Sequence, residues 1–378
     1  MNSRKKHKIL FISSWFPNKL EPTNGNFVQR HAETVALLHE VEILHAIGDF
    51  HQKKRFLFDD QIINGIRTLI VYYRNSRIPL LNFIRRMKAY RLGYKRMQKP
   101  DLVHGNVLNN NMLFAVYLKR KYKISFVVSE HWSALQEINH YKLSKLGKLI
   151  VKKIANSAVM IMPVTENLSF GIRKLGVTTS MKIIGNVVDK DLFTIGNKAR
   201  DKFIFLHVSS LIPLKNTDKI INAAVQIHLT NPNFELHIGG DGDVNKLKAF
   251  IKKYNAEDYI KTFGMILSEE VSKKMRDANC FVLFSDYENQ PCVILESFAT
   301  GIPVIAPKVG GISEILNSER GILIEKGNEK ELLKAMKNVL EGKTVFADPE
   351  EIRNYCVEHF SQLKIAEKFS EIYNLVLK

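Results

Sequence analysis

The sequence is poor in cysteine. Its 378 residues include only Cys280, Cys292 and Cys356, and their positions match no metal-binding or redox spacing. This excludes a small scaffold held together by disulfides. Two of the three lie in or beside segments that we expect to be buried, so the cysteines are expected to be reduced thiols of a cytosolic protein.

Long hydrophobic runs are also missing. The longest clean run, residues 158–164, is far shorter than the roughly 20 apolar residues of a membrane-spanning helix. The basic N-terminus is followed by the apolar run 9–12, which is too short for the core of a signal peptide. We therefore expect a cytoplasmic globular protein, long enough for two sizeable hydrophobic cores.

Acidic residues are scarce in the first half only. Residues 1–195 hold 32 Lys and Arg against 13 Asp and Glu, whereas residues 196–378 hold 24 against 25. The excess positive charge therefore belongs to one half of the chain. Such asymmetry indicates a surface that faces an anionic partner.

Two stretches of this basic half, residues 83–99 and 141–154, interleave Lys and Arg with apolar residues. Basic amphipathic helices bind anionic membrane surfaces, but solvated faces that cover a core have the same pattern, and both interpretations stay open. A membrane contact would place the protein peripherally on the inner face of the cytoplasmic membrane. No nucleic-acid-binding module is recognisable, so we expect no nucleic-acid partner.

Strand-like and helix-like segments alternate along both halves. Strands are expected at residues 8–13, 41–47, 68–73, 102–104, 124–129 and 159–164, and again at 203–208, 234–238, 259–264, 280–284 and 304–306. Amphipathic runs separate most of them, and the tail from residue 350 is expected to be helical. This alternation predicts α/β architecture with parallel sheets. We expect a first domain over residues 1–190, a linker over 191–202, a second domain over 203–355 and a terminal helix over 356–378.

The stretch Ser285–Gly301 carries the clearest chemical signal. The apolar run 280–284 before it is typical of a buried parallel strand, and Pro291 suits the first position of a helix that stops at Gly301. Glu288 lies on the turn and Glu296 lies two turns into the helix. Free N–H groups at such a helix start attract anions, and carboxylates accept hydrogen bonds from hydroxyls. These are the parts of a nucleotide sugar.

This stretch, with Gly301-Ile-Pro-Val304 and with Gly310-Gly311 before Glu314, resembles the retaining glycosyltransferases of family 4 and their Glu-x7-Glu signature. The resemblance implies the GT-B fold, in which two Rossmann-like domains face each other across a cleft and the last helix crosses back to the first domain. It also implies metal-independent, retaining transfer from a UDP-, GDP- or ADP-linked sugar to a saccharide or lipid-linked acceptor, in bacterial surface polysaccharide synthesis. No cofactor is expected.

The resemblance assigns roles to individual residues. Glu288 would bind donor-sugar hydroxyls and Glu296 the ribose, while Lys215 would neutralise the diphosphate. The family arginine that usually assists is replaced by Ser210, and the hydroxyls of Ser209 and Ser210 could fill the gap. Residues expected to line the donor are Gly25, Gly240, Gly264, Met265, Asn289, Gln290, Pro291, Cys292 and Val293. His131 would orient a phosphate oxygen or the sugar, with Glu130 as a rival in the same neighbourhood.

Three alternatives remain at this point. Asp241 and Asp243 form the Asp-x-Asp motif of metal-dependent transferases, although their position after a predicted strand favours a turn and a helix cap. The same architecture would also serve a nucleotide-sugar epimerase or a sugar phosphorylase. Finally, a basic chain of this kind could be a non-enzymatic binder of membranes or nucleic acid.

Overall fold

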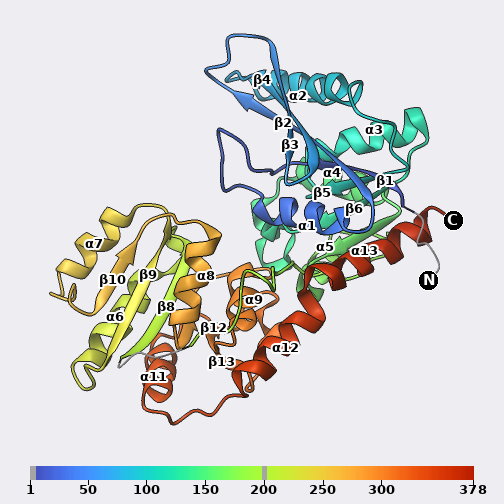
Figure 1. Cartoon of the computed structure of the whole chain (residues 1–378). Helices are drawn as coiled ribbons and strands as arrows, with labels where there is room; N and C mark the ends of the chain where they lie inside the picture. Colours follow the sequence, from blue (N-terminus) through green and yellow to red (C-terminus); the bar gives the residue numbers. More distant parts are fainter. Residues whose placement is uncertain (1–5, 198–201) are drawn as a thin grey trace. The chain divides into compact units, whose positions relative to one another are not determined.

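The computed structural model describes residues 6–197 and 202–378. The chain divides into two compact units, residues 1–187 with 363–378 and residues 188–362. Both are α/β units whose strands and helices alternate along the chain (Figure 1). The expected linker, residues 191–202, includes residues 198–201, which lie outside the described part.

Unit 1 is built on a seven-stranded sheet of order β3-β4-β2-β1-β5-β6-β7. The strands are β1 (Lys8–Ser13), β2 (Glu40–Asp49), β3 (Phe56–Ile63), β4 (Ile66–Arg74), β5 (Leu102–Asn106), β6 (Phe126–Glu130) and β7 (Met160–Pro163). All neighbours pair in parallel except β3, which pairs antiparallel with β4. β1, β5 and β6 are almost wholly buried, as expected of strands covered on both faces.

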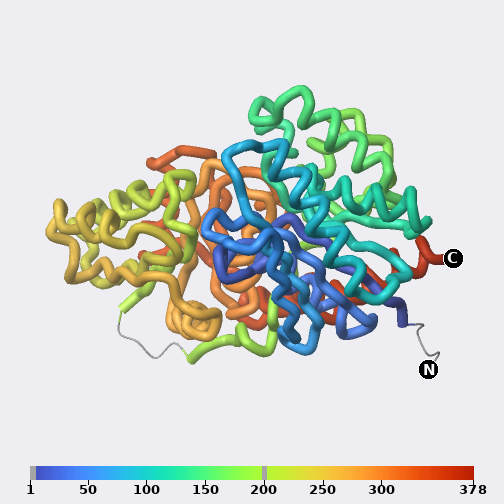
Figure 2. Tube along the Cα trace, turned by 90° about the horizontal axis from the view of Figure 1, so that it is seen from above, coloured from blue at the N-terminus to red at the C-terminus, as the bar shows by residue number. Residues whose placement is uncertain are grey.

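Helices cover this sheet. They are α1 (Asn26–Ala36), α2 (Pro79–Tyr94), α3 (Leu113–Tyr122), α4 (Lys145–Ala155) and α5 (Glu166–Lys174), with short 3-10 turns η1 (Asn110–Met112), η2 (Ser133–Leu135) and η3 (Glu137–Lys142). The last helix of the chain, α13 (Gln362–Val376), also belongs here (Figures 1 and 2). Its Tyr373 hydroxyl lies 2.6 Å from Nδ1 of the buried His104 of β5, and Phe369 packs in the same core.

The return of the chain end to unit 1 is therefore confirmed, but not as one helix from residue 356. The helical tail is broken at Ser361, where α12 (Pro349–Phe360) ends and α13 begins. α12 belongs to unit 2 and α13, apart from its first residue, to unit 1.

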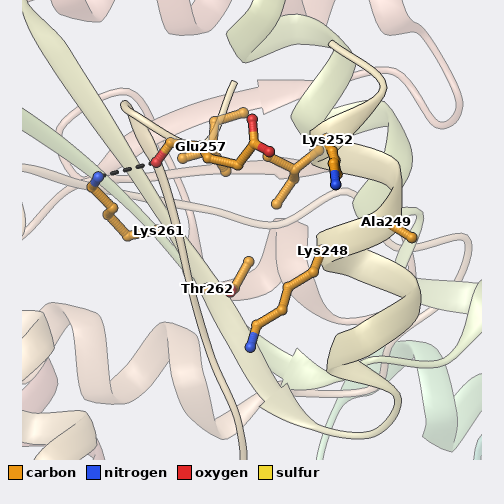
Figure 3. A pocket seen from close by; sticks show the side chains of 8 residues that line it. Lys248, Ala249, Lys252, Glu257, Lys261 and Thr262 are labelled. Atoms are coloured by element: carbon orange, nitrogen blue, oxygen red, sulfur yellow. Dashed lines mark hydrogen bonds between the residues drawn. The ribbon is translucent and has the colours of Figure 1, made fainter. Parts of the chain in front are cut away.

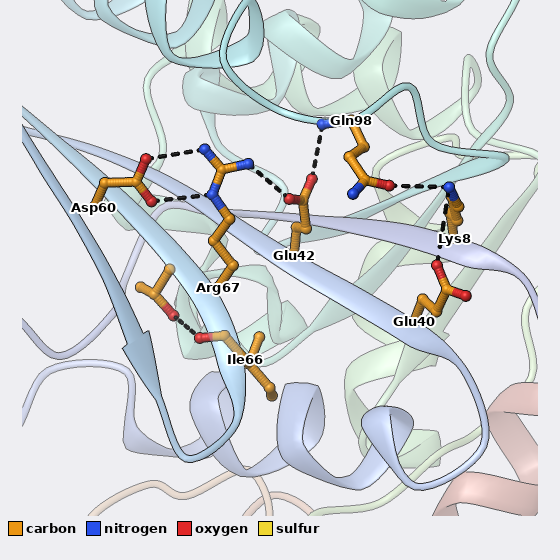
Figure 4. A network of polar contacts seen from close by, with 8 residues as sticks. Lys8, Glu40, Glu42, Asp60, Ile66, Arg67 and Gln98 are labelled. Carbon is orange, nitrogen blue, oxygen red and sulfur yellow. Dashed lines mark hydrogen bonds and ion pairs between the residues drawn. The ribbon is translucent and has the colours of Figure 1, made fainter.

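At the edge where its parallel strands begin, unit 1 carries a polar network (Figure 4). The Arg67 guanidinium lies 3.0 Å from the Glu42 carboxylate and 2.9 Å from that of Asp60. Glu42 also accepts the backbone N–H of Gln98, whose side chain accepts from Lys8. These contacts join the starts of β1, β2 and β4 and leave the opposite edge, where the strands end, for ligands.

Unit 2 is built on a fully parallel six-stranded sheet of order β10-β9-β8-β11-β12-β13. The strands are β8 (Phe203–Ser210), β9 (Phe234–Asp241), β10 (Ile260–Phe263), β11 (Cys280–Val282), β12 (Val304–Pro307) and β13 (Gly321–Ile324). The helices are α6 (Thr217–His228), α7 (Val244–Lys252), α8 (Ser268–Asp277), α9 (Cys292–Ala299), α10 (Ile312–Ile315), α11 (Glu329–Leu340) and α12, with the turn η4 (Pro213–Lys215).

Candidate active site

The order of strands in unit 2 marks one place for a ligand. From β8 the chain moves outward to β9 and β10, and it then returns to place β11 on the other side of β8. The loops that follow β8 and β11 therefore diverge at the carboxyl edge, the edge at which the strands end. Open α/β sheets bind their ligands at such a switch point. The predicted residues Ser209, Ser210 and Lys215 follow β8, and Glu288 follows β11.

An ion pair joins these two loops. The Lys215 ammonium nitrogen lies 2.5 Å from Oε1 of Glu288, and the two side chains are only 15% and 12% exposed. Hydrogen bonds of the next residue also connect the two loops. Asn216 donates to the Phe284 carbonyl and to the Asp286 carboxylate, each at 3.0 Å. Two residues predicted from separate motifs thus form one ion pair.

Helix α9 (Cys292–Ala299) begins four residues after Glu288. Pro291 is its N-cap residue, not its first helical residue as predicted, and the helix starts at Cys292. Val293 lies in the first turn. The preceding Asn289 accepts a hydrogen bond through its carbonyl from Gly311 N–H at 3.0 Å, so the Gly-Gly motif supports the turn. Gln290 is buried beside it.

Glu296 lies further along α9 and is only 5% exposed. Its charge lies near Cys356 of α12. Burial raises the pKa of that thiol to about 12; the Arg353 charge opposes this shift and the Glu296 charge adds to it. Cys356 is thus an un-ionised core thiol, as predicted for a structural cysteine. Glu296 is more enclosed than Glu288, so its role as a ribose ligand remains a proposal.

The hydroxyl of Ser209 is directed into the protein. His207 Nδ1 lies 2.8 Å from the Val282 carbonyl, which can only accept, and Nε2 lies 2.8 Å from Ser209 Oγ. Burial lowers the pKa of His207 to about 4, so its imidazole is neutral and carries its proton on Nδ1. Ser209 must then donate to Nε2, and its hydroxyl proton does not serve a phosphate. Ser210, in contrast, is exposed at the end of β8.

Two predicted glycines have structural reasons for lacking a side chain. A Cβ on Gly240 would lie 1.9 Å from the Ser209 carbonyl oxygen, and one on Gly25 would lie 2.4 Å from the Trp15 backbone. Both also have positive φ, 135° and 80°. The requirement for glycine at Gly25 therefore comes from the chain's own backbone and needs no ligand to explain it. Gly264 and Met265 lie exposed after β10.

The Asp-x-Asp segment forms a turn. Asp243 is the N-cap of α7 and accepts the N–H of Lys246 at 3.1 Å, as the cap interpretation predicts. Asp241 ends β9 and accepts Leu211 N–H through its carbonyl at 2.8 Å. Over residues 6–197 and 202–378, no group of three or more His, Cys, Asp and Glu is placed to hold a metal ion.

Unit 1 has a corresponding switch point between β1 and β5. Ser14 donates to the Asn109 side chain across it at 2.7 Å. Val107 adopts φ 71° just after β5, a strained conformation for a β-branched residue, of the kind that gathers at functional sites. Sequence reasoning missed Asn109 and Val107, and only their position directly after a predicted strand could have indicated them.

Glu130 organises the neighbouring loop. Its buried carboxylate accepts backbone N–H groups of Leu108, His131 and Trp132, and burial nevertheless raises its pKa to about 7. His131 follows, with its ring 4.2 Å from that of Phe27 and 5.2 Å from that of His31. Burial holds the pKa of His131 well below its usual value, so a neutral imidazole is the form available. Glu130 thus has a positioning role here.

Comparison with known proteins decides the family. The model of "Glycosyl transferases group 1" matches residues 188–359, and that of "Glycosyltransferase Family 4" matches residues 25–192. Together they span both units.

The chain belongs to glycosyltransferase family 4. Similar curated proteins include an uncharacterized glycosyltransferase of Methanocaldococcus jannaschii, 28% identical over 74% of this chain and 75% of that protein. Another is UDP-Gal:alpha-D-GlcNAc-diphosphoundecaprenol alpha-1,3-galactosyltransferase of Escherichia coli, 25% identical over 78% of this chain and 80% of that protein.

Solved structures show that this glycosyltransferase has the GT-B fold. Sucrose-phosphate synthase from Thermosynechococcus elongatus superposes with a TM-score of 0.78 at 18% identity, over 98% of this chain and 99% of the other. Anabaena HepE in complex with UDP-glucose gives 0.74 at 18% identity, over 98% and 100%.

Two surface hollows of unit 2 are distinct from the Lys215–Glu288 pair of this glycosyltransferase. One of about 480 Å³ lies between α7 and β10 (Figure 3), beside the start of β10 and not at the carboxyl edge. The second, of about 540 Å³, lies at the starts of α6 and α7. None of the predicted donor residues lines either hollow, so neither is assigned to the donor.

Proposed function

We propose that this glycosyltransferase is a retaining, metal-independent enzyme that moves a sugar from a nucleotide-sugar donor to a saccharide acceptor. The observation that supports it most directly is the Lys215–Glu288 pair at the switch point between β8 and β11, at the start of α9. A cation, a carboxylate and a helix N-terminus at one point suit a molecule that carries both phosphates and hydroxyls.

In this proposal the donor diphosphate binds at Lys215 and the backbone N–H groups that open α9. Glu288 accepts hydrogen bonds from the sugar hydroxyls and Glu296 from the ribose. UDP-sugars are the first donors to test, because the similar Anabaena protein was crystallised with UDP-glucose. The donor charge would be neutralised by Lys215 and the α9 dipole, without a divalent ion.

Retention of the anomeric configuration would follow if the acceptor hydroxyl attacks the anomeric carbon on the same face from which the leaving phosphate departs. The departing phosphate takes the proton of the acceptor hydroxyl, and the protein contributes position and charge. This scheme needs no protein base, and the lowered pKa of His131 agrees with a neutral orienting group there.

We further propose that the acceptor is a lipid-linked saccharide, used in bacterial surface polysaccharide synthesis. The E. coli relative is named for a diphosphoundecaprenol-linked acceptor, and a Bacillus subtilis relative, 22% identical over 87% of this chain and 88% of that protein, for teichuronic acid biosynthesis. The protein would then work as a peripheral enzyme at the inner face of the cytoplasmic membrane. None of the helices in the described parts of the chain has the length and apolar character needed to cross a bilayer.

The first experiment is a thermal-shift screen against UDP-, GDP- and ADP-sugars, since a ligand that binds the native state raises the unfolding temperature. The donor that shifts it is then supplied with lipid-linked acceptors, with and without EDTA, and the anomeric configuration of the product is determined by NMR. Full activity in EDTA with retained configuration supports the proposal. Loss of activity in EDTA, an inverted product, or epimerised donor without transfer contradicts it.

A further inference from the structure

The two basic stretches of unit 1 differ once the fold is known. Tyr90 of α2 is fully buried, and Arg91 of α2 and Arg96 just beyond its end stack on the rings of Tyr117 and Phe58 at 4.7 and 3.6 Å. These two arginines cover aromatic rings that pack against the core. The first turns of α2 expose Ile78, Leu80 and Ile84, but those arginines do not surround them.

The segment formed by η3 and α4 is different. It exposes four large apolar side chains, Ile138 (66%), Tyr141 (79%), Leu146 (67%) and Leu149 (65%). Lys142, Lys145 and Lys153 are exposed among them. We call these seven side chains the Leu–Lys surface. Large apolar side chains that one short segment leaves exposed together are typical of an interaction site.

The apolar residues of this surface are not displaced core residues. α4 already has a core-facing side, made of the buried Val151, Ile154 and Ala155. Leu146 and Leu149 are three positions apart and Lys153 lies four beyond Leu149, so all three share the opposite face. The Ser144 side chain accepts Gly147 N–H at 3.0 Å and caps the helix, which places Leu146 in its first turn.

The charge of the segment indicates the kind of partner. The segment from Glu137 to Ala155 holds one acidic residue, Glu137 at its start, against Lys142, Lys145, Lys148, Lys152 and Lys153, so its sequence is strongly basic. Exposed leucines and lysines on one basic segment complement a bilayer with anionic headgroups, where leucines enter the acyl boundary and lysines remain at the phosphates.

We propose that the Leu–Lys surface is a docking surface for an anionic lipid bilayer. η2, η3 and α4 follow β6, which ends at the carboxyl edge of the unit 1 sheet. Docking here would bring that edge to the membrane, where a lipid-linked acceptor is found. The purpose of the surface rests on the proposed function, but the binding itself needs neither donor nor acceptor.

The test is co-sedimentation of the purified full chain with vesicles of phosphatidylcholine alone or mixed with phosphatidylglycerol. We expect binding to the mixed vesicles that falls as salt is added. The double variant Leu146→Ser/Leu149→Ser is expected to bind at least about tenfold more weakly, because two inserted side chains are lost. Lys142→Gln and Lys145→Gln should each weaken binding roughly fivefold.

The matched control is Leu229→Ser/Val345→Ser, which removes two exposed apolar side chains of unit 2 and should bind like the wild type. Equal binding by the wild type and the α4 double variant would overturn the proposal. So would absence of vesicle binding, or self-association abolished by the α4 substitutions, which would assign the surface to a protein partner. Vesicle binding without any sugar transfer would refute the proposed function and leave this inference standing.

Discussion

At the scale of single residues, the site depends on charges that water screens only in part. Lys215 and Glu288 are largely buried, unlike the exposed Lys308–Glu325 pair of the same unit. Exposed pairs contribute about 0–1 kcal/mol, whereas removing one partner of a buried pair leaves an uncompensated charge and costs about 3–5 kcal/mol. The partly exposed Lys215–Glu288 pair lies between these limits. Substitution at this pair should therefore affect both stability and donor binding.

Ser209 gives the first prediction. Ser209→Ala removes the proton donor to the buried His207 Nε2, so we expect a loss of about 1–3 kcal/mol in the free energy of unfolding with unchanged donor affinity. Ser210→Ala, at an exposed neighbour, should leave stability unchanged. Denaturant unfolding and calorimetric donor titration measure the two quantities. A large drop in donor affinity in Ser209→Ala would show that this hydroxyl binds the phosphate after all.

Sequence reasoning predicted residues of the candidate site, but it did not predict the contacts that fix the neighbouring side chains. Glu288 and Lys215 were predicted because their motifs are local and specific. Two other features were not predicted, because both depend on which strands become neighbours. One is the direction of the Ser209–His207 bond, which the Val282 carbonyl of β11 sets, and the other is the acceptance of three backbone N–H groups by Glu130. Side-chain contacts between β8 and β11 follow from sheet order, which local patterns do not determine.

At the scale of elements, the end of α9 gives a second prediction. Gly301 and Gly342 both have φ 67°, but a Cβ on Gly301 would lie 2.7 Å from the Pro349 carbonyl oxygen, whereas nothing lies within 4 Å of one on Gly342. Gly342→Ala should cost only the left-handed conformation, about 1 kcal/mol. Gly301→Ala should cost clearly more, because α12 must shift as well. Equal unfolding temperatures for the two variants would contradict this packing of α9 on α12.

The elements themselves were predicted with uneven success. Strands β1 and β8 were predicted closely and the end of α9 at Gly301 was confirmed, because a continuous apolar run and a helix-ending glycine are local signals. β3 was missed, although Asn64-Gly65 between it and β4, with φ 48° and 80°, is a typical hairpin turn. The residues of β3 do not alternate between buried and exposed positions, so the sequence lacks the alternation of apolar and polar residues that indicates a strand.

At the scale of the whole molecule, buried histidines set the response to acid. Burial lowers the pKa of His31, His39, His45 and His207 to about 4 in the folded state, against 6.5 in an unfolded chain. The unfolded state therefore binds more protons between pH 6.5 and 4, and stability falls as the pH falls through that range. Burial raises the pKa of Glu130 to about 7, so this carboxyl group increases stability as the pH falls. Its single contribution opposes those of the four histidines.

We therefore expect the unfolding temperature to drop steadily from pH 7 to pH 4.5. Calorimetry over this range tests it, and His207→Gln should flatten the profile of unit 2. A profile that stays level, or that rises on acidification, would show that these imidazoles are protonated in the native state.

The sequence predicted two α/β domains more clearly than it predicted the role of each domain. The excess positive charge lies within residues 1–195, and the motifs place Lys215 and Glu288 in unit 2. The carboxyl edge of the unit 1 sheet, with Val107 and Asn109, has no comparable signature. Its residues come together only through the order of β1, β5 and β6.

The central claim is that Glu288 binds the sugar at the switch point of unit 2. It is tested most directly by the rate of sugar transfer in Glu288→Gln, compared with Glu325→Gln, which alters an exposed Lys–Glu pair of the same unit. We predict that Glu288→Gln loses about 100-fold or more of the transfer rate while it remains folded by circular dichroism, and that Glu325→Gln retains full activity. Near wild-type transfer by folded Glu288→Gln would contradict the account.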